Sequence, residues 1–372
     1  MNDTLQKVDV ERLYQHVLSI EGVKHPLIDP EKLNEAADYI KSEFQKYGLV
    51  TSEQTFEIEG YDMTFSNIEG HIGDDSKPEI LVTSHYDTVR NAPGANDNGS
   101  GIAAMLETAR VLADVKHSGS VRFISFTLEE LNPTLVQKYR DKGIELGILD
   151  ENYWYKSYHS QKMIKKFFSK TSLRIAKGQS ILDSWEKSYE EIKDDLTESE
   201  KEYCEYIIEL RSHTTRTSWV GQTGLIGSDY WVKKAMERNK QIKGVINLET
   251  IGYTSKRIGD FISVVSDKNS KQLGKAFCKN CKNEDIKLPY LWAKIPLRFE
   301  KIAKWMMDTL RSDNAPFWRE NIPALMITDT ANFRYPYYHT KADTIDKLDF
   351  DFIGKVTQAT IATVLDPSEM NV

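Results

Sequence analysis

The chain has 372 residues, 40% of them hydrophobic and 28% charged, and its formal net charge is −7. These values are ordinary for a globular protein with a large core, and they give no sign of a surface for nucleic acid. No apolar run approaches the roughly 20 residues of a membrane span, and the amino terminus lacks the pattern of a secretory signal. We therefore expect a cytoplasmic protein that binds neither nucleic acid nor membranes. The sequence does not indicate its oligomeric state.

Helices and buried strands are expected to alternate along the chain. Apolar residues at helical spacing predict a helix over residues 31–48, and alternating polarity with turn residues predicts a β-hairpin over 53–73. Four continuous apolar runs predict strands buried on both faces of a sheet, at 79–88, 120–130, 243–253 and 322–330. Helical patterns occupy 99–115 and 351–365. This alternation predicts an α/β/α sandwich around a mixed, largely parallel central sheet.

Residues 131–220 do not follow this alternation. The stretch is long, charged and helical in pattern, and it contains no convincing strand signal. We predict one α/β domain built from residues 1–130 and 221–372, with 131–220 as a helical insertion. Because the chain leaves the core directly after Glu130, the insertion is either a cap over the site described below or a set of surface helices packed on the core.

The three cysteines, Cys204, Cys278 and Cys281, do not have the even number expected of a disulfide framework. Cys278 and Cys281 form a C-x-x-C pair, a spacing found in redox pairs and in halves of zinc knuckles. No second pair completes a knuckle, so we interpret the two thiols as lying one turn apart on a helix.

Residue types that bind metal ions gather where the predicted strands end. Functional groups of open α/β sheets collect at the carboxyl ends of the strands. Imidazole and carboxylate groups without cysteine are typical of a catalytic zinc site rather than a structural one. The residues concerned are His85, Asp87, Asp97, Glu129, Glu130, Glu249 and His339.

Five of these residues supply enough ligands for two metal ions roughly 3.5–4 Å apart, a pair that can stabilise a hydrolytic transition state. The five ligands are His85, Asp97, Glu130, Glu249 and His339. Asp97 lies on the glycine-rich turn 93–101 and is the natural bridge between the two ions.

Two further acidic positions are expected to act beside the ligands. Glu129 and Glu130 are adjacent, so an extended strand end directs one toward a metal ion and the other toward water. Asp87 follows His85 by two residues on the same face of the strand. There it can accept a hydrogen bond from the ring nitrogen of His85 that does not bind metal.

Seven segments occur in a fixed order: HYDT, PGANDNGSG, FTLEE, GLIGS, NLETIGY, SDNAPFW and YHTKADTIDKLD. Together they resemble the M28 family of zinc aminopeptidases, which includes bacterial leucyl aminopeptidases and, more distantly, glutamate carboxypeptidase II. The resemblance covers about residues 30–130 and 221–365 and leaves out the insertion. It implies the fold of zinc peptidases, which is phosphorylase/hydrolase-like, and the hydrolysis of peptide or related amide bonds in a small substrate.

The resemblance also implies a role for each of these residues. His85 is a terminal ligand of one zinc ion, Glu130 is a ligand of the other, and Glu249 and His339 complete the set. Asp97 bridges the two Zn²⁺ ions and is followed by a cis peptide to Asn98, although the ligand types also accept other divalent ions. Glu129 is the general base that activates a zinc-bound water, with Asp87 behind His85.

The sequence departs from the family pattern where the substrate would be chosen. The family motif SDHxPF reads SDNAPF in this chain, so Asn314 replaces a histidine that lies near the substrate. Asp313 is interpreted as a structural carboxylate rather than a ligand. Tyr335, Tyr337 and Tyr338 either assist the reaction as donors or form an aromatic pocket wall.

A two-zinc hydrolase, of the aminopeptidase type, is the function that the sequence favours. The alternatives are a single-zinc cyclotransferase resembling glutaminyl cyclases, a small-molecule amidohydrolase and a non-catalytic binding protein. The complete set of five ligands favours two metal ions over the cyclotransferase. The retention of Glu129 together with the ligands favours an enzyme over a binding protein.

Overall fold

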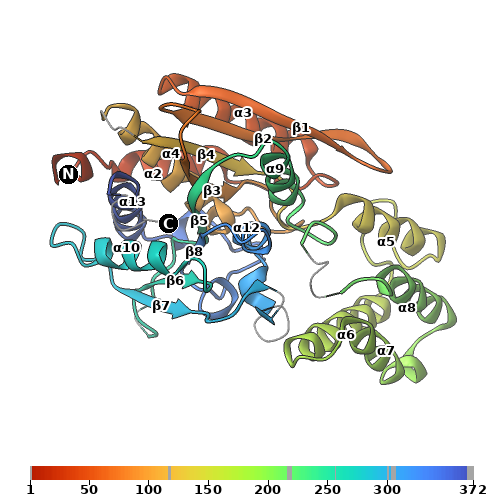
Figure 1. The fold of residues 1–372 in the computed structure, drawn as a ribbon. Helices are drawn as coiled ribbons and strands as arrows, with labels where there is room; N and C mark the ends of the chain where they lie inside the picture. The colour runs from red at the N-terminus through yellow and green to blue at the C-terminus, as the bar shows by residue number, and fades with distance from the viewer. Residues whose placement is uncertain are drawn as a thin grey trace.

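An eight-stranded sheet forms the centre of the protein (Figure 1). The computed structural model describes residues 2–115, 119–215, 220–255, 257–299, 301–302 and 307–366. The strands lie in the order β1-β2-β4-β3-β5-β8-β6-β7. Their bounds are β1 Val50–Ile58, β2 Tyr61–Ile72, β3 Glu79–His85, β4 Ser120–Phe126, β5 Ile242–Glu249, β6 Ile262–Ser266, β7 Tyr290–Lys294 and β8 Ala324–Thr328.

The four strands predicted as continuous apolar runs are neighbours in the middle of the sheet. Strands β4, β3, β5 and β8 run parallel to one another. The hairpin β1–β2 joins β4 in an antiparallel sense at one edge. At the other edge β6 runs antiparallel to β8, and β7 runs parallel to β6. The predicted α/β/α sandwich with a mixed sheet is confirmed, and the short strands β6 and β7 are additions to it.

Helices cover both faces of this sheet. One face carries α2 Val10–Ile20, α3 Pro30–Lys46, α4 Gly101–Ala113, α10 Lys271–Cys281 and α13 Phe350–Leu365, with α1 Asn2–Leu5 beside α13. The other face carries α9 Ile226–Glu237 and α12 Asn314–Arg319. Side chains alternate along β3, because Ile80 and Val82 join the core of the first face while Leu81 joins that of the second.

Local sequence explains where several of these helices begin and what they contain. Asp29 caps α3 by accepting a hydrogen bond from the Lys32 N–H at 2.9 Å, and Pro30 occupies the first helical turn. Cys278 and Cys281 are both buried in α10, and burial raises the pKa of Cys278 to about 12. Thiols with such a high pKa are poor nucleophiles, as expected for core residues.

Helices also occupy the described part of the predicted insertion, 131–215 and 220. They are α5 Pro133–Glu145, α6 Tyr158–Ala176, α7 Ile181–Glu190, η2 Lys193–Asp195 and α8 Glu198–Arg211. Figure 1 shows them gathered on one side of the molecule, in yellow-green and green. Phe167, Trp185 and Ile207 belong to a hydrophobic cluster of their own, separate from the two sheet cores. None of the helices in the described ranges is both long and apolar enough to cross a membrane.

Candidate metal centre

The residues singled out in the sequence come together at the carboxyl ends of the parallel strands. His85 is the last residue of β3, and Glu249 is the last residue of β5. Asp97 lies in the helical turn η1 Ala95–Ser100 that leads into α4. Glu129 and Glu130 follow β4, and His339 lies in the long loop after β8, beyond η4 Ala331–Phe333. The ends of four parallel strands, β3, β4, β5 and β8, and the segments that follow them therefore supply one cluster.

Asp97 faces two histidines with its two different oxygen atoms. Its Oδ1 lies 3.4 Å from His85 Nε2, and its Oδ2 lies 3.1 Å from His339 Nε2. His85 Nε2 is also 3.5 Å from Glu249 Oε2, and His339 Nε2 is 3.1 Å from Glu130 Oε1. Ligand atoms around a tetrahedral zinc ion with bonds of about 2.0–2.1 Å are separated by about 3.3 Å. Each histidine thus lies beside one oxygen of Asp97 and a second carboxylate. Two sets have ligand atoms close enough together to hold an ion, namely His85 with Asp97 and Glu130, and His85 with Glu129 and Glu249.

Three atoms of this cluster lack the partners that buried polar atoms need. His85 Nε2, His339 Nε2 and Asp97 Oδ2 are buried and make no hydrogen bond of acceptable geometry with the described residues. Each such atom costs about 1–3 kcal/mol, so their convergence calls for a bound group. Burial lowers the pKa of His85, but the carboxylates of Glu129 and Glu249 outweigh it and hold that pKa well above its usual range. This excess of negative charge fits divalent cations.

Asp87 connects the first histidine to the two glutamates. Its carboxylate accepts hydrogen bonds from the backbone N–H groups of Glu129, at 3.0 Å, and of Glu130, at 3.1 Å. His85 Nδ1 lies 3.2 Å from the backbone oxygen of Asp87 and 3.5 Å from its carboxylate. Asp87 therefore lies behind His85, as expected, and it also positions the turn that carries both glutamates.

Glu129 and Glu130 differ from the expectation of an extended strand end. Strand β4 stops at Phe126, and Leu128 has a positive φ of 55°, so the chain turns before the two glutamates. Both side chains consequently face the cluster, with Glu129 Oε2 4.0 Å from His85 Nε2. Burial raises the pKa of Glu129 well above its usual range, and the neighbouring Glu130 adds to the shift against the opposing charge of His85.

Asp343 holds the turn that carries Asp97, and the sequence analysis did not single it out. Its carboxylate accepts hydrogen bonds from the backbone N–H groups of Asn96, at 2.8 Å, and of Asp97, at 3.2 Å. It also accepts one from the hydroxyl of Tyr335, at 2.7 Å. Its position four residues after His339, within the HTKAD segment, was the available signal.

Asn98 connects this turn to β5, and Ser312 contacts the end of the same strand. The peptide between Asp97 and Asn98 is cis, as the resemblance implies. The side chain of Asn98 donates to the carbonyl oxygen of Leu248 at 2.9 Å, and Ser312 Oγ donates to Glu249 Oε2 at 2.7 Å. Ser312 begins the SDN segment, in which the sequence analysis interpreted only Asp313 and Asn314.

A cavity of about 460 Å³ opens beside the cluster. Asp97, Glu129, Glu130, Glu249 and His339 form its polar wall, and Val265, Met326 and Phe333 contribute apolar surface. Tyr338 lines the cavity and stacks on His339 at 3.8 Å. Asn314 does not line it but donates to the carbonyl oxygen of Thr309, a lining residue, at 3.1 Å. Among the described residues of 131–220, none lines the cavity.

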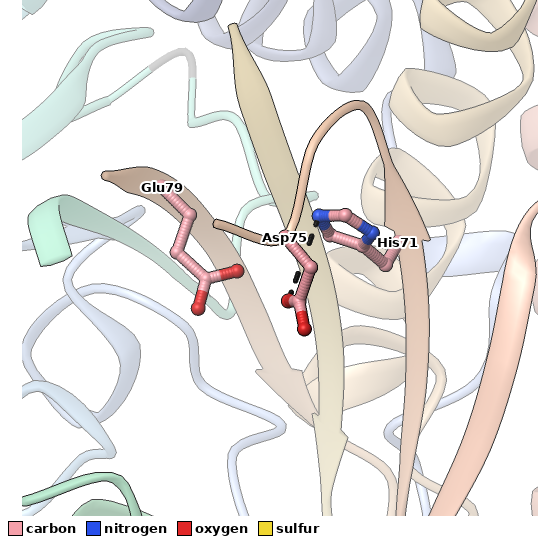
Figure 2. Close-up of side chains that lie close together, drawn as sticks. All are labelled: His71, Asp75 and Glu79. Atoms are coloured by element: carbon pink, nitrogen blue, oxygen red, sulfur yellow. Dashed lines mark ion pairs between the residues drawn. The ribbon is translucent and has the colours of Figure 1, made fainter. Parts of the chain in front are cut away.

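A second acidic cluster lies at the opposite end of β3 (Figure 2). His71, Asp75 and Glu79 are close enough together to hold an ion. However, Glu79 accepts hydrogen bonds from Arg122 Nε at 2.9 Å and from Lys240 Nζ at 3.0 Å, and Arg122 also pairs with Asp75. Two cations already balance these carboxylates, so we interpret the cluster as an ion-pair network.

The fold and the cluster together define a class of α/β proteins with a metal centre at the carboxyl ends of their strands. The chain belongs to peptidase family M28, whose sequence model matches residues 67–364.

Individual relatives agree with this assignment. A segment of 114 residues is 39% identical to Aminopeptidase YwaD of Bacillus subtilis, covering 30% of this chain and 20% of that protein. The uncharacterised protein YfbL of Escherichia coli is 24% identical over 385 residues, covering 94% of this chain and 86% of YfbL. The crystal structure of the LapA aminopeptidase of Legionella pneumophila superposes with a TM-score of 0.62 at 18% identity, covering 98% of this chain and 73% of LapA. That likeness shows the shared fold.

Proposed function

We propose that this chain is a zinc-dependent hydrolase of peptide bonds, of the aminopeptidase type, with two ions in its centre. The ligands would be His85, Asp97, Glu130, Glu249 and His339. The observation that most supports two ions is the position of Asp97, whose two oxygens face different histidines. Each histidine has a further carboxylate at 3.1–3.5 Å, which supports a bridging role for Asp97 between an ion held by His85 and one held by His339.

The protein side chains would divide the proton transfers and the positioning between them. Bound zinc would lower the pKa of water toward roughly 7 and polarise the substrate carbonyl. Glu129 would take a proton from the attacking water and deliver it to the leaving amine, since it lies 4.0 Å from His85 Nε2 and is not one of the five proposed ligands. The raised pKa of Glu129 suits a group that must hold that proton between the two steps. Asp87 would hold the backbone of Glu129 and the ring of His85 in fixed positions relative to each other.

Replacement of Glu129 tests this proposal. We expect Glu129→Gln to lower kcat by about 10²–10⁴-fold on aminoacyl amides while the protein still binds two zinc ions, because only the proton acceptor is lost. Zinc content is measured by elemental analysis, and rates are measured on panels of aminoacyl and N-acyl amides. Glu57→Gln, an exposed glutamate of β1, is the matched control.

Two results would contradict the proposal. Unchanged activity in Glu129→Gln would mean that another group is the base. A single tightly held zinc ion, together with cyclisation of peptides that begin with glutamine, would instead identify a cyclotransferase.

A further inference from the structure

Arg311 brings a positive charge into the cavity beside the metal centre. Among the described lining residues it is the only arginine or lysine. It directly precedes Ser312, whose hydroxyl donates to Glu249 Oε2 at 2.7 Å and accepts from Asn247 at 2.7 Å. The backbone that carries Arg311 is therefore fixed to the metal centre, which suits a side chain that must act at a defined position.

The guanidinium of Arg311 is only weakly engaged by the protein. Its contact with Asp308 is 3.5 Å long, and both side chains are more than a third exposed. An exposed pair of this length contributes little, so most of the five N–H donors stay available for a ligand. Partial desolvation lowers the pKa of Arg311, but the nearby Tyr338, Asp308, Glu130 and Glu129 outweigh it and hold that pKa above its usual range. The guanidinium is therefore charged at every relevant pH.

We infer that Arg311 binds a carboxylate of the substrate, so that the peptidase acts on short peptides with a negative charge close to the scissile bond. The inference rests on the proposed function. Arginine presents paired N–H donors that match a carboxylate, which is why it is common where carboxylates are recognised. Zinc ions would neutralise Glu130 and its neighbours, so an anionic substrate would meet the charge of Arg311 without their repulsion.

The size and the apolar lining of the cavity agree with this substrate class. A volume of about 460 Å³ falls in the range of sites for small molecules. Val265, Met326 and Phe333 offer apolar surface for one side chain of such a peptide. The carboxylate could be the carboxyl terminus of a dipeptide or the acidic side chain of the residue next to the scissile bond. The chemistry of recognition is the same for both, and matched substrates distinguish them.

The test compares charged and neutral partners of two substrate pairs in the zinc-loaded protein. Leu-Ala against Leu-Ala-amide tests the carboxyl terminus, and Glu-p-nitroanilide against Gln-p-nitroanilide tests the side chain. We expect Arg311→Met to lower kcat/KM about 10–100-fold for the charged member of one pair, mainly through KM. The neutral member should change less than about 3-fold. Arg311→Lys should retain part of the preference, because it keeps the charge but loses the paired donors.

A uniform loss on all four substrates would overturn the inference, because it would make Arg311 a counter-charge that positions Glu129 and Glu130. An absence of preference for either charged substrate in the wild-type protein would overturn it as well. Lys347→Met removes one positive charge outside the cavity lining and is the matched control.

Binding without turnover separates this inference from the proposed function. Leu-Ala and its amide are titrated calorimetrically into Glu129→Gln and into the double variant Glu129→Gln/Arg311→Met. Preferential binding of the acid that disappears in the double variant would support the role of Arg311 even if no peptide is cleaved. Hydrolysis of both substrates by the wild-type protein, together with equal affinity of Glu129→Gln for the acid and the amide, would support the proposed function and overturn the role of Arg311.

Discussion

Asp343 shows how a residue outside the proposed ligand set can hold the turn that carries a proposed ligand. Its Oδ1 accepts hydrogen bonds from the backbone N–H of Asn96 and from the hydroxyl of Tyr335, and its Oδ2 accepts one from the backbone N–H of Asp97. We expect Asp343→Asn to lower zinc affinity about 10–100-fold, because an amide offers one accepting oxygen where the turn needs two. Competition with a chromophoric chelator measures the change.

Asp346→Asn is the control for this prediction. Asp346 lies three residues further along the same loop, in η5 Ile345–Lys347, and its carboxylate is exposed and pairs with Thr344 and Lys347. Equal zinc affinity in Asp343→Asn and Asp346→Asn would show that the turn keeps its shape without Asp343.

The contrast between Asp343 and the ligands explains what the sequence can reveal at this scale. His85 and Glu249 end strands, and Asp97 lies on a glycine-rich turn, so strand ends and spacing were enough to propose them as ligands. Asp343 acts on residues that lie 246 and 247 positions earlier in the chain. No local pattern carries such a contact, so its role follows only from the folded chain.

At the scale of elements, the insertion is joined to the core in a way that allows its removal. The backbone N–H of Asn132, just before α5, donates to the carbonyl oxygen of Thr223 at 2.8 Å, so the two ends of the insertion meet. Its hydrophobic cluster is separate from the two sheet cores. A short linker in place of residues 135–215 should therefore leave the sheet and the metal centre folded.

The predicted capping role gives this deletion a functional outcome. Arg90 follows Val89, a cavity residue, and donates to the carbonyl oxygen of Tyr153 at 3.2 Å while its guanidinium lies 4.8 Å from the Trp154 ring. The insertion thus contacts the cavity rim through the turn at 153–154. We expect the deletion to raise kcat/KM for tetrapeptides relative to dipeptides about 10-fold, because a rim contact that limits length is lost. Unchanged preference, at equal zinc content, would count against a cap.

A milder variant covers the case in which the deletion fails to fold. Phe167 is fully buried in the insertion and packs against Trp185 with ring centroids 5.1 Å apart. Phe167→Ala should cost about 3–5 kcal/mol and loosen only the insertion, which limited proteolysis can locate. Its substrate preference should move in the same direction as that of the deletion.

Element type was easier to predict than element position. The helical spacing of 131–220 and the apolar runs of β3, β4, β5 and β8 follow directly from local pattern. Strands β6 and β7 have only five residues each, and β7 is a half-buried edge strand. β6 pairs with β8, and β7 pairs with β6. This pairing decides their conformation, so the sheet is wider than the sequence indicated.

At the scale of the whole molecule, the buried carboxylates link stability to pH. Burial raises the pKa of Asp313 to about 7, of Asp329 to about 7 and of Asp343 to about 6, compared with about 3.9 in an unfolded chain. The metal-free folded protein therefore holds protons that the unfolded chain releases. Stability from these groups is complete below about pH 4 and is lost as the pH rises toward 7.

Bound zinc should reverse this dependence of the free energy of unfolding on pH. Its ligands bind in their deprotonated forms, so zinc affinity increases with pH, and free zinc at 100 times the dissociation constant adds about 2.7 kcal/mol to the free energy of unfolding. We expect the gap in Tm between zinc-loaded and chelator-treated protein to widen from pH 5 to pH 8, as scanning calorimetry can measure. The metal-free protein should lose at least about 2 kcal/mol over that range.

Asp329→Asn separates the contribution of one carboxylate from that of the metal. Asp329 accepts hydrogen bonds from the side chain of Asn96 and from the backbone of Tyr253, each at 2.8 Å, and it is not one of the proposed ligands. The amide does not titrate, so the metal-free variant should lose less stability between pH 5 and pH 8 than the wild type. A metal-free wild-type protein whose Tm is constant or rises over this range would show that the buried carboxylates keep ordinary pKa values. The cluster would then not need cations to offset its charge, and the argument for two bound ions would lose its electrostatic support.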